Sequence, residues 1–396
     1  MHSLSRFVLT CLTTAAPLLV AVGLFPCAPA PARAETLSAL RSAGSVIVET
    51  RLGGLIFGFE VDPFTTEGLL CGAVTNRDGS VSASVETFNQ ATGAIIRVLS
   101  QTESQDDFVA LGVAGSVGLV ERERVEGFQV RRSFQIINPL AGDKLNGVWT
   151  PPIDQQHIVN QVKPAFDGSS NVAVYAIDVS PNATPLVFSS NLAANTFGPV
   201  IEITNPNFTV EAPPLLAFDP PRNQAILGHN KPSPFILPPV IGVVNLSSGN
   251  FVQRTGLGLG VINGIAIDSA DGILCTDTSF DSGVQFFHLS DFNGSGINVL
   301  LPGAAQDNST ASGGDIEFDP INKLFLVAQA FSDGKLDNGS SVQVYDLDGN
   351  LVESINGLLF QGGDNVFPVH ITLNPSRRIG FVDGPDLTTE IQSFNY

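Results

Sequence analysis

Four residues of the chain have the chemistry needed to bind a metal ion or to assist hydrolysis, and all lie in or beside short apolar segments. They are Glu60, Asp315, Glu317 and His370. Carboxylate oxygens are preferred ligands of hard divalent cations such as calcium, and an imidazole can complete such a site. A cation held in this way could also polarise the carbonyl of a bound ester or lactone and activate water. These residues are candidate metal or ligand contacts, provided that the fold brings them together.

Four further residues are candidate contacts because they are expected in loops on the same side of the fold. They are Asp277, Asp333, Asp383 and His229. A structural interpretation is also open and is the simpler one, because aspartate is common in turns and His229 could be an ordinary loop residue. Glu60 and Glu317 could likewise make structural hydrogen bonds between sheets. No cofactor other than a divalent metal is expected, because the glycine-rich segment 256–260 precedes a strand and opens no helix.

The elements that must position these residues recur along the chain. Each unit reads as an apolar strand, a turn that begins with Asp or Asn, and a second apolar strand, which is the pattern of a hairpin. The turn residues of the four clearest units are Asp219, Asp268, Asp319 and Asn374, separated by 49, 51 and 55 residues. Third and fourth strands complete the unit. A period of about 50 residues with four strands is typical of a β-propeller.

Seven such units can be recognised in the sequence. They begin near residues 57, 107, 157, 213, 263, 314 and 369. The unit near residue 157 is degenerate, and its third strand is predicted at Val172–Asp178. The last unit ends at Tyr396 after three strands, so a strand around Ser45–Glu49 is predicted to supply the fourth and close the ring. The sequence therefore predicts an all-β, seven-bladed propeller of four-stranded antiparallel blades.

This arrangement predicts where the candidate contacts meet. In a propeller, the loops that lead into first strands and the loops that join second to third strands share one end of the central channel. His370 and Asp315 lie four residues before their turn residues, whereas Glu60 and Glu317 lie two residues before theirs. Blades 6, 7 and 1 are consecutive in the ring. We therefore expect these four side chains to converge.

The first strands and their turns, such as Gly264-Ile-Ala-Ile-Asp268, resemble those of the broad lactonase-like and NHL/SMP-30-like group of exported propellers. The resemblance covers all seven units and rests on structural strands and turns. The group includes lactonases, lyases and binding scaffolds, and no catalytic motif of the group is matched residue for residue. The resemblance thus implies the fold and leaves the activity open.

The first 34 residues have the layout of a secretory signal. A short segment with Arg6 precedes an apolar stretch from Phe7 to Phe25, and cleavage is predicted after Ala34. Residues 35–396 are then expected to form a single propeller domain in the periplasm or outside the cell. No later segment is apolar enough to span a bilayer.

The net charge of the chain narrows the classes of partner that it could bind. The formal net charge is −19, which argues against nucleic acid and anionic membranes as partners. A small-molecule or protein ligand at an acidic face is expected, with the chain acting as a monomer.

Cys71 and Cys275 fall on blades 1 and 5, too far apart for the ~4.4–6.8 Å Cα separation of a disulfide. Both are predicted to be buried free thiols.

Two functions are compatible with these features. One is an exported binding scaffold whose acidic face binds a cation, a cationic ligand or another protein. The alternative is a metal-dependent hydrolase of the lactonase or esterase type that acts at the central channel and uses a divalent metal such as calcium. Glu60, Asp315, Glu317 and His370 would be its ligands or bases.

Overall fold

The structure of the chain is a computed structural model. The residues it describes are 45–49, 55–75, 78, 80–103, 106–126, 129–150, 158–167, 170–178, 185–194, 196–204, 215–229, 240–254, 262–278, 283–291, 297–300, 310–332, 340–356, 358, 370–383 and 390–396. The predicted signal segment 1–34 lies outside this part of the chain. Among the described residues, no helix has the length and apolar character needed to cross a membrane.

The described strands form seven separate antiparallel sheets. Blade 1 contains β2 (Leu55–Val61), β3 (Glu67–Thr75), β4 (Val81–Asn89) and β5 (Ile95–Glu103), and blade 2 contains β6 (Asp106–Ala114), β7 (Val117–Glu126), β8 (Gln129–Asn138) and β9 (Asp143–Trp149). Blade 3 contains β10 (Ile158–Asp167), β11 (Ser170–Asp178), β12 (Leu186–Asn191) and β13 (Thr196–Phe197), with β14 (Ile201–Glu202) also paired to β12. Blade 4 contains β15 (Leu215–Asp219), β16 (Gln224–His229), β17 (Val240–Asn245) and β18 (Phe251–Arg254).

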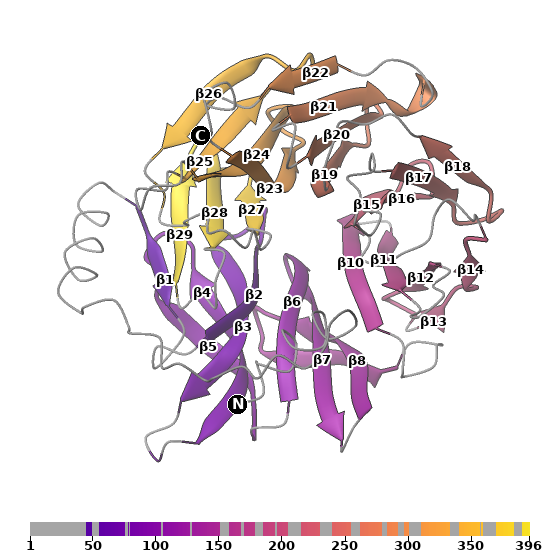
Figure 1. Cartoon of the computed structure of the whole chain (residues 1–396). Helices are drawn as coiled ribbons and strands as arrows, with labels where there is room; N and C mark the ends of the chain where they lie inside the picture. The colour runs from indigo at the N-terminus through magenta and orange to yellow at the C-terminus, as the bar shows by residue number, and fades with distance from the viewer. Residues whose placement is uncertain are drawn as a thin grey trace, which may run out of the picture.

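The remaining three sheets complete the ring. Blade 5 contains β19 (Ile262–Asp268), β20 (Ile273–Thr278), β21 (Gly283–His288) and β22 (Ile297–Leu300), with a 3-10 turn at Leu289–Asp291. Blade 6 contains β23 (Thr310–Asp319), β24 (Leu324–Ser332), β25 (Ser340–Tyr345) and β26 (Leu351–Asn356), and blade 7 contains β27 (Ile371–Asn374), β28 (Ile379–Asp383), β29 (Glu390–Asn395) and β1 (Ile47–Glu49). Each first strand contacts the first strands of both neighbouring blades, so the first strands form the inner wall of a closed ring (Figure 1). The prediction of a seven-bladed propeller is confirmed.

The ring closes through an N-terminal strand, as predicted. Strand β1 pairs antiparallel with β29, and Val48 lies opposite Ile391. The amide of Ser393 donates to the carbonyl of Val46 at 2.8 Å. Gly93 of blade 1 packs against this junction at φ 71°, where an added Cβ would come within 2.2 Å of the Ile47 carbonyl oxygen. The first and last strands of the described chain therefore lie in one blade, and blade 1 supports the junction.

The prediction for blade 3 was wrong in one detail. The segment Val172–Asp178 belongs to β11, the second strand of the sheet, and the third strand is β12. The true first strand, β10, has the sequence IVNQVKPAFD. Its polar residues and Pro164 hide the alternation that marks an ordinary strand. The strand count of the blade was therefore shifted by one.

The core lies between the blades, in apolar clusters that each join neighbouring sheets. Cys71 of blade 1 packs with Phe108 and Val120 of blade 2, and Cys275 of blade 5 packs with Ile316 and Phe325 of blade 6. Both cysteines are free and fully buried, as predicted. Burial, and then the nearby charge of Glu86, raise the pKa of the Cys71 thiol well above its usual value. These thiols behave as small apolar residues.

The turns between first and second strands are built as the sequence predicts. In three of these turns, the aspartate side chain accepts a hydrogen bond from the backbone N–H two residues later. The distances are 2.8 Å from Phe64 N to Asp62 Oδ1, 3.0 Å from Ala270 N to Asp268 Oδ1 and 2.8 Å from Ile321 N to Asp319 Oδ1. These turns define one end of the channel, called here the turn end. The opposite end, where β23 and β27 begin, is called the His370 end.

Candidate functional site

His370 stands at the centre of a polar cluster that joins three consecutive blades. It precedes β27 in blade 7, and its Nδ1 lies 2.9 Å from Asp315 Oδ2 on β23 of blade 6. Its Nε2 lies 3.1 Å from the Phe59 carbonyl oxygen and 3.4 Å from Glu60 Oε1, both on β2 of blade 1. The ring of Phe59 packs edge-on against the imidazole, with ring centroids 5.0 Å apart. The cluster therefore bridges blade 7 to both of its neighbours.

The hydrogen-bond partners of His370 fix its protonation. A backbone carbonyl can only accept, so Nε2 must carry a proton. Asp315 accepts from Ile371 N at 3.3 Å and from Ile316 N at 3.0 Å, which favours its carboxylate form and makes Nδ1 a donor as well. Burial alone would lower the pKa of His370, but Asp315 and Glu60 outweigh burial and hold the pKa well above its usual value. His370 is thus an imidazolium at neutral pH.

Glu60 is held by a second contact to blade 7. The hydroxyl of Thr372 donates to Glu60 Oε2 at 3.1 Å. The same hydroxyl accepts from Val61 N at 3.4 Å. Glu60 and Thr372 both lie two residues before their turn residues, so equivalent positions on adjacent first strands meet directly. Glu60 thereby joins the cluster through both of its oxygens.

Asp383 completes the cluster at the end of β28. Its Oδ1 accepts from the backbone N–H of His370 at 2.8 Å. Burial raises the pKa of Asp383 to about 7, although the charge of His370 and the hydrogen bond from its backbone work in the opposite direction. Asp383 therefore exchanges a proton near neutral pH. A carboxyl group with so large a shift beside a second titrating group is a common sign of a functional site.

The cluster is accessible to solvent but not open. The side chains of Glu60, Asp315 and His370 are 18%, 19% and 30% exposed. Two of them belong to the first strands that form the inner wall, and His370 immediately precedes a third (Figure 1). A ligand could therefore reach the carboxylates from the channel without unfolding a blade.

The other predicted contacts have different positions. Glu317 lies two residues beyond Asp315 and lines a separate cavity with Phe318 and Lys323. Asp277 and His229 lie at the ends of β20 and β16, but their side chains lie outside what the structure describes, as does the whole of Asp333. Of the eight predicted contacts, the structure brings together Glu60, Asp315, His370 and Asp383.

His370 itself is not arranged to ligate a metal ion. Both nitrogens of His370 donate hydrogen bonds, so neither offers the lone pair that a metal needs. Within the described part of the chain, no group of three or more His, Cys, Asp or Glu side chains is arranged to hold a metal. The arrangement is better suited to an organic cation, which would bind the carboxylates by hydrogen bonds.

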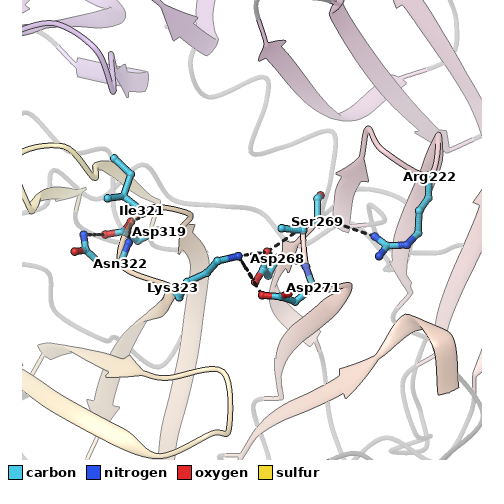
Figure 2. Close-up of polar contacts among 9 residues, drawn as sticks. Arg222, Asp268, Ser269, Asp271, Asp319, Ile321, Asn322 and Lys323 are labelled. Atoms are coloured by element: carbon cyan, nitrogen blue, oxygen red, sulfur yellow. Dashed lines mark hydrogen bonds and ion pairs between the residues drawn. The ribbon is translucent and has the colours of Figure 1, made fainter.

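The turn end contains a second polar network, which sequence reasoning missed. Arg222 of blade 4 donates to Asp219 at 3.0 Å and to the Ser269 carbonyl of blade 5 at 2.9 Å. The ammonium of Lys323 in blade 6 lies 2.9 Å from Asp268 Oδ2 and 3.2 Å from Asp271 Oδ2 (Figure 2). The signal for these links was the basic residue three or four positions after the turn aspartate. This network holds neighbouring blades together through the basic side chains of Arg222 and Lys323.

Among the solved structures with a similar fold, two are named as propellers. The β-propeller domain of Myceliophteria thermophila Cps50 (Swd1) matches with a TM-score of 0.53 and 10% identity, over 89% of this chain and all of that domain. The Dos1 propeller matches with a TM-score of 0.54 and 9% identity, over 88% of this chain and 94% of that one. Chaetomium thermophilum Raptor matches with a TM-score of 0.55 and 10% identity, over 88% of this chain but only 28% of Raptor.

No protein-family model matches the chain, and no curated protein matches it. The structural matches are below the identity at which function can be transferred, so they show the fold alone. The chain has the β-propeller fold of these proteins.

Proposed function

We propose that the chain is a binding propeller that receives a cationic group at the His370 end of its channel. The observation that carries this proposal is a partly exposed cluster in which Asp315 and Glu60 contact the imidazolium of His370 while Asp383 accepts from its backbone N–H. Glu60, Asp315 and Asp383 together outweigh the single charge of His370 at pH values above the pKa of Asp383. An excess of acidic charge in a partly desolvated site favours a cation over an anion or a neutral ligand.

The same geometry supports binding rather than catalysis. A histidine needs a free lone pair to act as a general base or to ligate a metal ion. His370 has no free lone pair, because one ring N–H donates a hydrogen bond to Asp315 and the other donates to the Phe59 carbonyl. Asp315 is also held by two backbone N–H groups. The cluster is therefore preorganised to hold charge in place.

A hydrolase of the lactonase or esterase type is the second candidate. The proximity of Glu60, Asp315 and His370 favours it, as does the resemblance of the strand and turn sequences to the lactonase-like and NHL/SMP-30-like propellers. This function requires a divalent metal such as calcium on the carboxylates and the displacement of at least one imidazolium contact. It is the weaker proposal because that displacement removes hydrogen bonds that the structure contains.

We also propose that the chain is exported as a mature protein that begins at Glu35. The supporting feature is the signal-like layout of residues 1–34. N-terminal sequencing of protein recovered from the periplasm or the medium tests this directly. A mature protein that retains Arg6 would contradict it.

Calorimetric titration of the purified mature chain tests the binding proposal. Agmatine serves as the guanidinium probe and calcium chloride as the metal probe. We expect agmatine to bind, and we expect E60Q and D315N each to weaken binding at least tenfold, about 1.4 kcal/mol. E353Q is the matched control, because Glu353 lies exposed on the outer strand β26. At pH 7, binding should release protons from Asp383, which appears as a difference in heat between buffers.

Two outcomes would decide against this proposal. Agmatine binding that E60Q and D315N leave unchanged would place the ligand elsewhere. Turnover of an ester or lactone that requires calcium, and that both variants abolish, would establish the hydrolase instead.

A further inference from the structure

We propose that the turn end of blades 6, 7 and 1 is a docking surface for an acidic segment of a partner protein. The surface consists of residues 319–323, 374–378 and 62–65, and is called here the three-turn surface. It lies at the opposite end of the channel from His370. His370 precedes the first strand of blade 7, whereas the turns of this surface follow the first strands and join them to the antiparallel second strands. The proposal is independent of cation binding at the His370 end.

The three turns form one connected unit. The hydroxyl of Ser376 donates to the Pro63 carbonyl at 3.0 Å, and the Asn322 amide lies 3.5 Å from the Pro375 carbonyl. The amide of Asn374 donates to the carbonyls of Asp62 and Thr65, each at 3.0 Å. A partner that binds here would meet side chains on a backbone that is already fixed. Such preorganisation reduces the entropy lost on binding.

Two large apolar side chains project from this unit. Phe64 is 74% exposed and Ile321 is 63% exposed, the highest values among the large apolar residues of the described chain. Both occupy the same turn position, two residues after the aspartate, and the hydrogen bond from their own N–H to that aspartate fixes the backbone beneath them. Exposed aromatic and branched side chains on a rigid base are typical anchors of protein interfaces.

The exposed charges of the surface are positive. The two carboxylates of the turns, Asp62 and Asp319, are 1% and 0% exposed and are bonded inward. Arg377 and Arg378 lie exposed on the middle turn, between the turns that hold Phe64 and Ile321. In a chain with 38 acidic and 19 basic residues, this local excess of positive charge is unusual. Charge complementarity therefore favours a partner segment that carries carboxylates between bulky apolar side chains.

A cavity adjoins the surface on the side of blade 5. It has a volume of about 380 Å³ and is lined by Pro320, Lys323, Ile267 and Phe318, among others. Pro320 is the residue directly before Ile321, so the cavity and the exposed anchor share one turn. A partner side chain that enters this cavity would extend the contact from the three turns toward the channel.

Selection of a random peptide library displayed on phage against the immobilised mature chain tests this proposal. We expect the enriched peptides to combine Asp or Glu with Phe, Leu or Trp. A synthetic enriched peptide is then titrated by fluorescence anisotropy. F64A, I321A and R377E should each weaken its binding at least tenfold, whereas R377K should retain binding. V352A is the control, because Val352 is 57% exposed on the outer strand of blade 6.

Three results would overturn the proposal. Selection could enrich no peptide, or only basic peptides whose binding depends on Glu60 and Asp315, which would support the His370 end alone. The enriched peptides could bind equally well to F64A, I321A and R377E. Sedimentation could also show self-association that F64A abolishes, which would make a second copy of the chain the occupant of this surface.

Discussion

The two ends of the channel both contain buried or half-buried carboxylates, but they satisfy them differently. At the turn end, Asp62, Asp268 and Asp319 each accept backbone N–H groups from their own turn. At the His370 end, Asp315 and Glu60 share one imidazolium that comes from another blade. Each of these three aspartates thus has a partner within its own turn, whereas the His370 cluster exists only when three blades are assembled.

This difference separates carboxylates that stabilise the fold from carboxylates that are available to bind a ligand. At the turn end, the aspartates accept local N–H groups and stabilise the fold. At the His370 end, burial, and to a smaller extent the charge of Asp315, raise the pKa of Asp383 to about 7. Three variants test the comparison.

The largest effect is expected from loss of a turn aspartate. Asp319 is fully buried and accepts four hydrogen bonds, from Ile321 N, Asn322 N, Asn322 Nδ2 and the Tyr396 hydroxyl. D319A should lower the free energy of unfolding by about 3 kcal/mol, because it leaves these donors without a partner. Denaturant titration measures the change.

The matched control is D346A. Asp346 makes a similar turn at the outer edge of blade 6 and accepts from Asp348 N, Asn350 N and Asn350 Nδ2. It is less buried, so its loss should cost only about 1 kcal/mol. Equal losses of unfolding free energy in the two variants would show that burial at the channel adds nothing to the stability that the turn provides.

A smaller, pH-dependent effect is expected from Asp383. Its pKa is raised from 3.8 to about 7 in the folded chain, so its proton favours the folded state. This contribution is fully present below about pH 4 and is lost as the pH rises through 7. D383N keeps an acceptor for the His370 N–H but cannot ionise. It should match the wild type at pH 4 and exceed its stability at pH 8 by about 2 kcal/mol, roughly half of what the full shift implies, because Asp383 is partly exposed and solvent screens its charge.

Thermal unfolding across this pH range checks the prediction. His370 also loses its stabilising charge as the pH rises through its own raised pKa, but D383N retains that transition. Parallel pH curves for D383N and the wild type would mean that Asp383 does not titrate in this range.

The smallest effect is expected at the turn of blade 4. Within the described residues, Asp219 Oδ1 is buried with no hydrogen-bond partner. The cause is Pro221, which stands two residues later and has no N–H to donate. P221S restores that donor but loses the rigidity of proline, so we expect a net gain of about 0.5 kcal/mol. A lower melting temperature for P221S would show that Arg222 alone satisfies Asp219.

Structural features that depend on a few neighbouring residues could be predicted from the sequence. Features that depend on how the blades pack together could be predicted only in part. The turn aspartates act within two or three residues, so their period gave the seven blades. The missing fourth strand of the last blade indicated β1. Blade 3 was misread because Pro164 and the polar residues of β10 obscure its first strand. At the candidate site, equivalent positions in blades 6, 7 and 1 indicated that His370, Asp315 and Glu60 would meet.

The protonation of the site could not be predicted. It depends on the Phe59 carbonyl, a backbone atom that leaves no mark in the sequence. It also depends on how deeply Asp383 is buried, which is determined by the packing of the complete ring. Glu317 shares the register position of Glu60 and yet lines a different cavity, so register alone does not determine where a side chain contributes.

The pairing of β1 with β29 also has a consequence for biosynthesis. During synthesis from the N-terminus, β1 emerges first and its partner emerges last. Strand β1 must therefore stay unpaired while six blades form, and Val48, which is fully buried in the finished ring, stays uncovered for that time. We expect the ring to close only after β29 has emerged, so that chains truncated before Glu390 remain open and prone to proteolysis.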